Sequence, residues 1–286
     1  MLRAVRSLAL AFLLTTPAVA APALWQVSDE DSSIWLFGSV HMLQPGTEWR
    51  SETLDKLLVK ADRVYFETDI SAEAQMRIAP LSFEVGFYRD GSLLSEHIEP
   101  ELMDRLRAVA ADYGIPVPSL LIMRPWMAAT TLSVMVLAET GYDPLLGVET
   151  VLGNEVPKER TGYLETPEEQ IGILAGGSPE EEIAMLEATL DGLDVMTAEI
   201  DGMVAAWLAG TPESLGELFM AQMGAFDETF VTRLIDERNA NWANQIEQML
   251  AANEAALLIV GAAHLIDEVS VVRMLEEKGF TSRRIQ

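Results

Sequence analysis

The chain has 286 residues, no cysteine and a formal net charge of −26, and 49% of its residues are hydrophobic. This length and composition are ample for a buried core, so we expect a folded globular protein. Because cysteine is missing, disulfides, thiol nucleophiles and thiolate metal sites are excluded, and any metal must be held by His, Asp or Glu. Since so acidic a surface repels phosphate backbones, we expect no nucleic-acid partner.

The first 20 residues have the pattern of a signal peptide. Arg3 and Arg6 precede an apolar run over 8–14, and an Ala-x-Ala pattern at 18–20 fits a cleavage site. The apolar run is far shorter than the ~20 residues that a bilayer span needs. We therefore expect an exported protein, periplasmic or secreted, without a membrane span after cleavage. Cleavage removes two arginines and no acids, which changes the formal charge from −26 to −28.

The beginning of the mature chain predicts a hairpin and then a strand, helix, strand unit. Two strand-like segments, Ala23–Asp29 and Ser33–Phe37, are separated by a short acidic turn. A helix opens at Ser51, and the next β-type segment, Arg63–Phe66, ends at Glu67. We expect the second and third strands to form a parallel pair with a right-handed crossover.

The middle of the chain is predicted to be helical. Caps and apolar spacing indicate helices over Glu99–Tyr113, Arg124–Glu139, Pro179–Leu208 and Pro212–Met223. Since no low-complexity linker or repeat occurs, we expect one domain over 21–286 with a helical insertion at about 97–225. The predicted class is α/β, with a central mixed, largely parallel sheet flanked by helices.

A long helix is predicted over Asp227–Ala251, and its apolar stripe contains two polar residues, Arg238 and Asn239. A buried guanidinium must be paired or hydrogen-bonded. Arg238 is therefore expected to face either an anionic group in a site or a core carboxylate such as Glu67 or Glu149.

Three polar side chains each follow an apolar strand-like run: His41, Glu67 and His264. The two histidines share a Gly-x-x-His spacing, at 38–41 and 261–264. Since ligands bind beyond the carboxyl ends of strands in open α/β sheets, we expect these side chains to meet in one crevice. Two imidazoles and a carboxylate suit Mn, Co or Zn and leave positions for water and substrate. Such an ion activates water for attack on a carbonyl.

Other candidates are less specific. The third histidine, His97, lies in a polar segment typical of a surface loop or a helix entry. No Gly-x-Ser-x-Gly elbow occurs, so a Ser-His-Asp triad is not supported. Glu149 and Glu165 each lie beside a glycine or a turn, and each could be a further ligand, a general base or the partner of Arg238.

Several short motifs, in a fixed order, make the chain resemble a known family. They are Leu24–Val27, the Gly-x-x-His at 38–41, Glu67 in Tyr-Phe-Glu-Thr-Asp, Gly141–Gly147 followed by Val148 and Glu149, Glu165–Gln170, Arg238 and Asn239 with Trp242, and Val260–Leu265. Together they are similar to the TraB/GumN family. Its relatives include the Tiki metalloproteases and, more distantly, erythromycin-esterase-like and ChaN-like proteins.

The resemblance implies a metal-dependent hydrolase with His41, Glu67 and His264 as ligands, and peptide bonds as the substrate class in the Tiki branch. The leading hypothesis is an exported metallohydrolase, a peptidase that acts on a peptide or protein substrate. Besides Glu67 and Glu149, its catalytic set includes Arg238 to stabilise the oxyanion and Asn239 to orient a ligand or the substrate. Two alternatives stay open: a protein that binds haem or metal in the same crevice without turnover, and an inactive scaffold.

Overall fold

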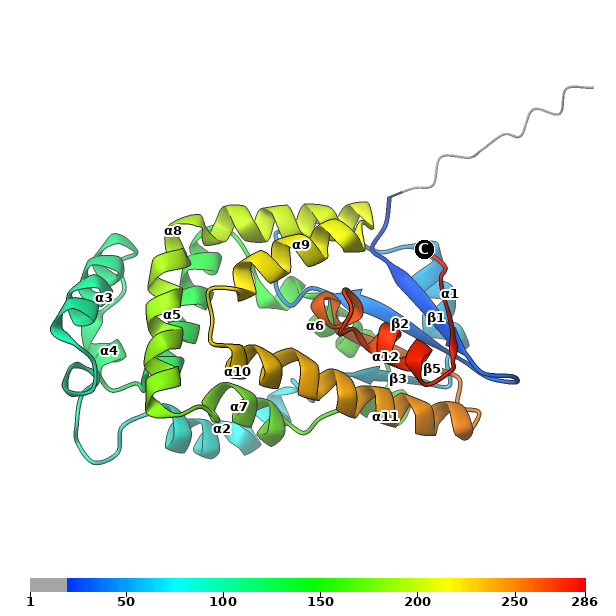
Figure 1. Cartoon of the computed structure of the whole chain (residues 1–286), viewed down its shortest axis with the longest axis horizontal. Coiled ribbons are helices and arrows are strands. Elements are labelled where there is room, and N and C mark those ends of the chain that lie inside the picture. The colour runs from blue at the N-terminus through cyan, green and yellow to red at the C-terminus, as the bar shows by residue number, and fades with distance from the viewer. Residues whose placement is uncertain (1–19) are drawn as a thin grey trace, which may run out of the picture.

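A six-stranded mixed sheet organises the computed structural model, which describes residues 20–286 (Figure 1). The strands, in chain order, are β1 (Leu24–Ser28), β2 (Ser33–Ser39), β3 (Arg63–Phe66), β4 (Thr161–Tyr163), β5 (Ala256–Gly261) and β6 (Thr281–Arg284). Their order across the sheet is β4-β3-β5-β2-β1-β6. The first four of these are parallel, and β1 is antiparallel to both β2 and β6. The predicted α/β class is confirmed, whereas residues 1–19 of the predicted signal peptide lie outside the described residues.

The central strand is β5, which comes from the far end of the chain. All six of its residues are buried, as the unbroken apolar run at 257–260 indicates for a strand covered on both faces. It pairs in parallel with β2 on one side and with β3 on the other. The predicted pairing of β2 with β3 is therefore wrong. These two strands run in the same direction, but β5 lies between them because its two apolar faces fill the centre of the sheet.

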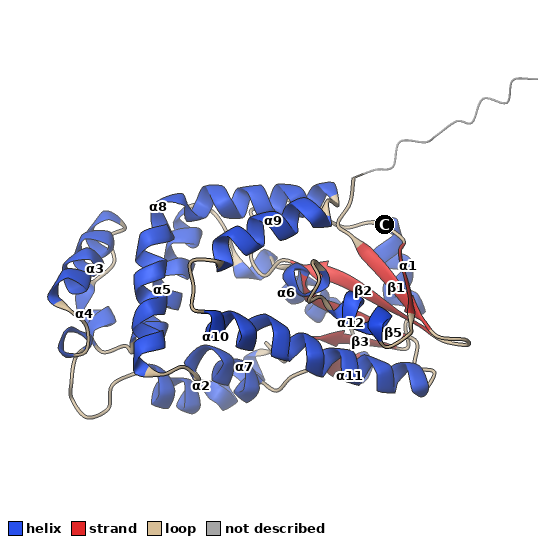
Figure 2. Cartoon of the chain, viewed as in Figure 1, coloured by secondary structure: helices blue, strands red, loops and turns tan. Residues whose placement is uncertain are grey.

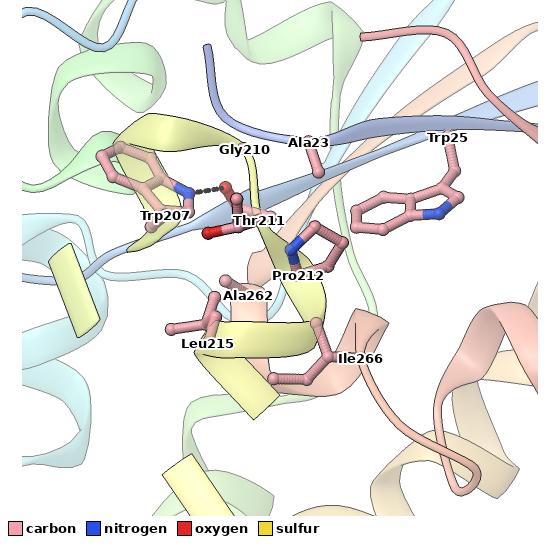
Figure 3. A pocket seen from close by; sticks show the side chains of 10 residues that line it. Ala23, Trp25, Trp207, Gly210, Thr211, Pro212, Leu215, Ala262 and Ile266 are labelled. Atoms are coloured by element: carbon pink, nitrogen blue, oxygen red, sulfur yellow. Dashed lines mark hydrogen bonds between the residues drawn. The ribbon is translucent and has the colours of Figure 1, made fainter. Parts of the chain in front are cut away.

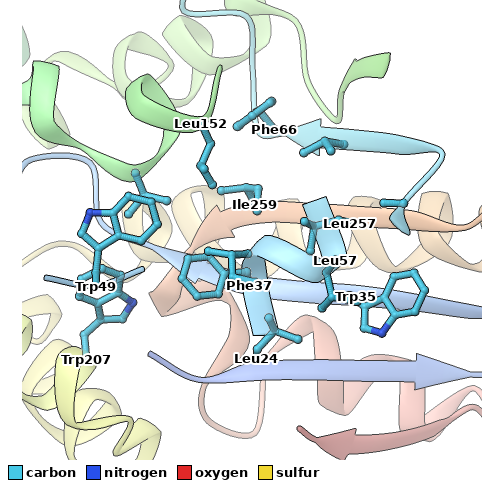
Figure 4. Close-up of a cluster of buried hydrophobic side chains, with 14 of the residues drawn as sticks. Leu24, Trp35, Phe37, Trp49, Leu57, Phe66, Leu152, Trp207, Leu257 and Ile259 are labelled. Carbon is cyan, nitrogen blue, oxygen red and sulfur yellow. The ribbon is translucent and has the colours of Figure 1, made fainter. Parts of the chain in front are cut away.

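Alternating side chains of the strands supply two separate cores, one on each face of the sheet. Helices α1 (Glu52–Lys60) and α6 (Val148–Glu155) cover the first face, and α11 (Glu237–Ala251) and α12 (Val271–Glu277) cover the second. Figure 4 shows the first core, where Phe37 and Ile259 of the sheet lie among Leu152, Trp49 and Trp207. Since both faces are covered, the open part of the sheet is at its strand ends.

The remaining longer helices lie beside the sheet. They are α2 (Ala72–Gly86), α3 (Pro100–Asp112), α4 (Val117–Leu121), α5 (Pro125–Glu139), α7 (Pro167–Ala175), α8 (Pro179–Ala209) and α9 (Pro212–Met223). Four of them, α3, α4, α5 and α8, share a third core. Helices α3 and α4 lie at the end of the molecule away from the sheet (Figure 2). The first half of α8 packs in the helical core, and its Trp207 reaches the sheet core. Among residues 20–286, no helix has both the length and the apolarity to cross a membrane.

A π-helical turn interrupts the long helix that was predicted over 227–251. The observed segments are α10 (Glu228–Val231), the π turn Thr232–Asp236 and α11. The backbone N–H of Glu237 bonds to the carbonyl of Thr232, five residues back. Single π turns of this kind are frequent at functional sites, and this one ends two residues before Arg238.

Candidate metal centre

His41, Glu67 and Glu149 meet at the carboxyl ends of the parallel strands. Each offers one ligand atom, and these atoms all lie within 4.8 Å of one another. His41 comes two residues after β2, Glu67 comes directly after β3, and Glu149 lies in the first turn of α6. The first two were predicted to be metal ligands, and Glu149 was predicted to be a candidate for a further one.

A close backbone contact brings α6 to the exit of β2. The N–H of Val148 donates to the carbonyl of Val40 at 3.0 Å. Gly147, just before this helix, lies so close that a Cβ atom there would be 2.0 Å from the carbonyl oxygen of His41. Only glycine fits this approach without displacement, which explains why the segment that carries Glu149 begins with Gly147.

The two oxygens of Glu149 have different surroundings. Oε1 accepts a short hydrogen bond from the hydroxyl of Ser39 and lies 2.8 Å from Nδ1 of His41. Oε2 is buried and has no hydrogen-bond partner among the described residues. The negative charge of Glu149 raises the pKa of His41 above its usual 6.5. Because 66% of the His41 side chain is exposed, solvent screening weakens this effect.

The carboxylate of Glu67 is buried, and both of its oxygens accept hydrogen bonds. Its Oε1 accepts from the backbone N–H of Gly261 at 2.6 Å, and its Oε2 accepts from Arg238 at 2.6 Å and from Gln170 at 3.3 Å. Burial alone would raise the pKa of Glu67, but the charges of His41 and Arg238, together with the other contacts, hold this pKa down at about 2. Glu67 is therefore an anion at neutral pH.

All N–H groups of the Arg238 guanidinium are engaged. Nε and Nη2 donate to the two oxygens of Glu165 at 2.8 and 3.0 Å, and Nη2 also donates to Glu67. Nη1 donates to the carbonyl of Leu234, in the π turn, at 3.3 Å and contacts Nε2 of His264 at 3.0 Å. The predicted pairing of Arg238 with a core carboxylate is confirmed for Glu67, and Glu165 is its second carboxylate partner.

His264 is buried, and its neighbours indicate a neutral ring. The amide nitrogen of Asn239 donates to the carbonyl of Val269 at 2.7 Å, so the amide oxygen faces Nδ1 of His264, also at 2.7 Å. Nδ1 therefore carries the proton, and Nε2 accepts from Arg238. Burial lowers the pKa of His264 to about 3. In this structure the nitrogen that could bind a metal faces Arg238 instead.

The predicted site residues are thus divided into two layers. His41, Glu67 and Glu149 form the cluster that could hold an ion. In a second layer, Glu165 and His264 contact Arg238, and Asn239 contacts His264. His264 therefore lies beside the cluster and is not one of its three members. His97 is exposed, as expected, and stacks on Tyr88.

Sequence reasoning missed the roles of Ser39 and Gln170. Ser39 lies within the first Gly-x-x-His segment, so its place beside a ligand could have been inferred. Gln170 lies one turn into α7, after the Thr166 N-cap, and nothing in its local pattern indicates a contact with Glu67. The indole N–H of Trp242, noted before only as part of a motif, donates to Glu165 at 3.0 Å.

The residues present fit a divalent cation. Nitrogen and carboxylate donors suit Mn, Co or Zn. Oε2 of Glu149, which no donor from residues 20–286 meets, supplies a buried acceptor. Gly261 leaves room beside them, since an added Cβ would lie 3.0 Å from Oε1 of Glu67 and 3.6 Å from Nε2 of His41. Glu67, Glu149 and Glu165 carry three potential negative charges, of which Arg238 balances one and a protonated His41 balances another in metal-free protein. A bound cation would offset the excess.

Two hollows lie near the strand ends, and neither is lined by His41, Glu67 and Glu149. Figure 3 shows an apolar one, lined by side chains that include Trp207, Leu215 and Ile266. Gly38 also lines it, and the indole N–H of Trp207 donates to the Gly38 carbonyl at 2.8 Å. It leaves too little room for a substrate. The other is an open cleft lined by residues of α2, α7 and the end of β4, and Glu165 forms part of its wall.

Gly147→Ala is predicted to destabilise the protein by about 1–3 kcal/mol, because the new Cβ forces the carbonyl of His41 away from α6. Gly153→Ala, in the same helix, is the matched control. A Cβ at Gly153 meets no atom within 4 Å, so this change should stabilise by about 0.5–1 kcal/mol. Urea unfolding measures both values, and equal effects would contradict the close contact at Gly147.

The neutral state of His264 predicts a loss of stability in acid for metal-free protein. Its folded pKa of about 3 lies below the ordinary 6.5, so the folded state binds fewer protons than the unfolded state between these values. The stabilisation is complete above pH 6.5 and is lost as the pH falls towards 3. Only the parent has the imidazole, so its unfolding free energy should fall relative to that of His264→Gln by up to about 3 kcal/mol when the pH is lowered from 7 to 4. An imidazolium ring in ¹⁵N NMR spectra at pH 5 would contradict this assignment.

Comparisons with known proteins agree with the pattern of motifs. No solved structure matches the chain. An uncharacterized protein of Treponema pallidum (strain Nichols) is 20% identical over 273 residues, which cover 89% of this chain and 80% of that protein. The sequence profile of the TraB/PrgY/gumN family matches residues 23–284, which include every member of the cluster and of the layer around Arg238. The chain therefore belongs to the TraB/PrgY/gumN family.

Proposed function

We propose that the protein is an exported metal-dependent hydrolase that cleaves peptide bonds, with the ion held by His41, Glu67 and Glu149. The observation that carries the proposal is that Oε2 of Glu149, in a cluster of three potential ligands, is buried and lacks a hydrogen-bond partner in the part of the chain that the structure describes. An unsatisfied buried carboxylate oxygen costs free energy unless a cation or a donor meets it. Bound at this point, a divalent ion would polarise a carbonyl and activate water.

The surrounding residues prepare the ligands for this role. Glu67 stays ionised because its pKa is about 2, and its two oxygens are fixed by Gly261 and Arg238. Since the N–H groups of Arg238 are all engaged, we assign Arg238 to holding Glu67 and Glu165 rather than to direct contact with an oxyanion. Both oxygens of Glu165 accept from Arg238, which favours its role as a partner over a role as general base.

His264 and Asn239 act together in this proposal. Asn239 fixes the tautomer of His264, and His264 accepts from Arg238. The pair therefore supports the orientation of Arg238, and through it that of Glu67. Side chains that orient metal ligands typically affect metal affinity 10–100-fold when they are changed.

The substrate class and the export rest on sequence. The resemblance to the Tiki branch supports peptide bonds, and the pattern of residues 1–20 supports a signal peptide. His41, at the rim of the cluster, is exposed enough for an extended substrate to approach it from solvent.

Titration of metal-free protein with Mn²⁺ and Co²⁺ in a calorimeter tests the ligand set. Glu149→Gln should abolish measurable binding, because it replaces the free anionic oxygen. His264→Ala should weaken binding less, because Nε2 of His264 faces Arg238 in this structure. If His264→Ala lost binding as completely as Glu149→Gln did, His264 would have to be counted as a direct ligand.

A peptide-library digest tests turnover with the same proteins. The parent should cleave peptides only with Mn²⁺ or Co²⁺, and Glu149→Gln should be inactive. Metal binding without cleavage would refute the hydrolase proposal. A Soret band on haem titration, again without cleavage, would favour the haem-binding alternative.

A further inference from the structure

The hydroxyl of Ser39 lies at the end of β2 and donates to Oε1 of Glu149. We propose that Ser39 is a positioning residue, which fixes the carboxylate of Glu149 so that Oε2 faces the cation. This inference rests on the cation site of the proposed function and adds to it a residue that contacts neither metal nor substrate.

The hydrogen bonds of Glu149 support this role. Oε1 receives two donors, Ser39 and Nδ1 of His41, which is the number of lone pairs that a carboxylate oxygen offers in its plane. Oε2 receives none from the described part of the chain. The two donors therefore decide which oxygen stays free.

Of these two donors, Ser39 is the more firmly held. Its residue is 2% exposed, whereas the His41 side chain is 66% exposed. Ser39 also pairs with Gly261 across the ladder between β2 and β5, and the carbonyl of the preceding Gly38 accepts from Trp207. Without the Ser39 hydroxyl, Oε1 of Glu149 would keep only the exposed donor His41. Its carboxylate could then turn and lose its alignment with Glu67.

The same geometry separates this role from that of a nucleophile. An attacking serine needs a base that accepts its proton, commonly an imidazole. The hydroxyl of Ser39 donates to Glu149, and the His41 nitrogen nearest to Glu149 bonds to the same oxygen rather than to Ser39. Ser39 is therefore placed to orient a carboxylate.

Calorimetric titration of the purified, metal-free full chain with Mn²⁺ tests the proposal. Ser39→Ala should weaken Mn²⁺ binding about 10–100-fold, the usual effect of removing a group that orients a ligand. Ser39→Cys keeps the size of the side chain but offers only a weak donor, so it should weaken binding in the same direction and serves if the alanine variant does not fold. Ser51→Ala is the matched control. It removes a hydroxyl that caps α1, away from the cluster, and should leave Mn²⁺ affinity unchanged.

A double-mutant cycle shows whether Ser39 acts through Glu149. Glu149→Asp keeps an anionic ligand, but its shorter side chain is out of reach of the Ser39 hydroxyl. In this background, the added change Ser39→Ala should weaken Mn²⁺ binding by less than about 3-fold relative to Glu149→Asp alone. Equal losses from Ser39→Ala in both backgrounds, or parental affinity in folded Ser39→Ala and Ser39→Cys, would overturn the positioning role. In those cases the parent still binds Mn²⁺ and the proposed function stands. A parent that binds no Mn²⁺ or Co²⁺ would instead overturn the cation site and this role with it.

Discussion

The buried guanidinium of Arg238 is the group on which the rest of the site depends. Taking a charge out of water costs several kcal/mol unless partners replace the lost solvent. Here the partners come from three strand ends: Glu67 after β3, Glu165 after β4 and His264 after β5. One side chain from α11 therefore holds together groups that are more than 190 residues apart in sequence. Removing any partner would leave a charge or a polar atom buried without compensation.

The two sides of the sheet contribute differently to the centre. On the side of α11, Arg238, Asn239 and His264 are hydrogen-bonded to one another or to neighbours, and Trp242 lies against both Arg238 and His264. On the side of α6, Glu149 keeps one oxygen without a partner among residues 20–286. Glu149 lies in the first turn of α6, where the helix dipole attracts negative charge. The site thus combines a hydrogen-bonded layer around Arg238 with one carboxylate oxygen, Oε2 of Glu149, that is open to a cation.

Sequence reasoning located the strand-end residues but not their mutual arrangement. An apolar run followed by glycine or a polar residue predicts the carboxyl end of a buried strand. This pattern predicts His41, Glu67 and His264 at the same end of the parallel strands. The face on which each side chain lies depends on turn geometry after the strand, which local patterns do not determine. Ser39 is the last residue of β2 and lies inside the first Gly-x-x-His segment, but its contact with Glu149 depends on the approach of α6, which local patterns do not contain. The insertion of β5 between β2 and β3 depends on long-range pairing, which the local pattern at 33–66 does not contain.

The two Gly-x-x-His segments have the same spacing, but their neighbours give the two histidines different protonation states. In the first, the histidine is exposed and lies beside a carboxylate, which favours the imidazolium in the absence of metal. In the second, the histidine is buried between an amide and a guanidinium, which favours the neutral ring. Both glycines allow a close approach at a crowded strand end. A Cβ added at Gly38 would lie 3.0 Å from Ala262, and a Cβ added at Gly261 would lie 3.0 Å from Oε1 of Glu67. The motif therefore determines where an imidazole is placed, and the second layer of residues determines whether that imidazole faces an ion or an arginine.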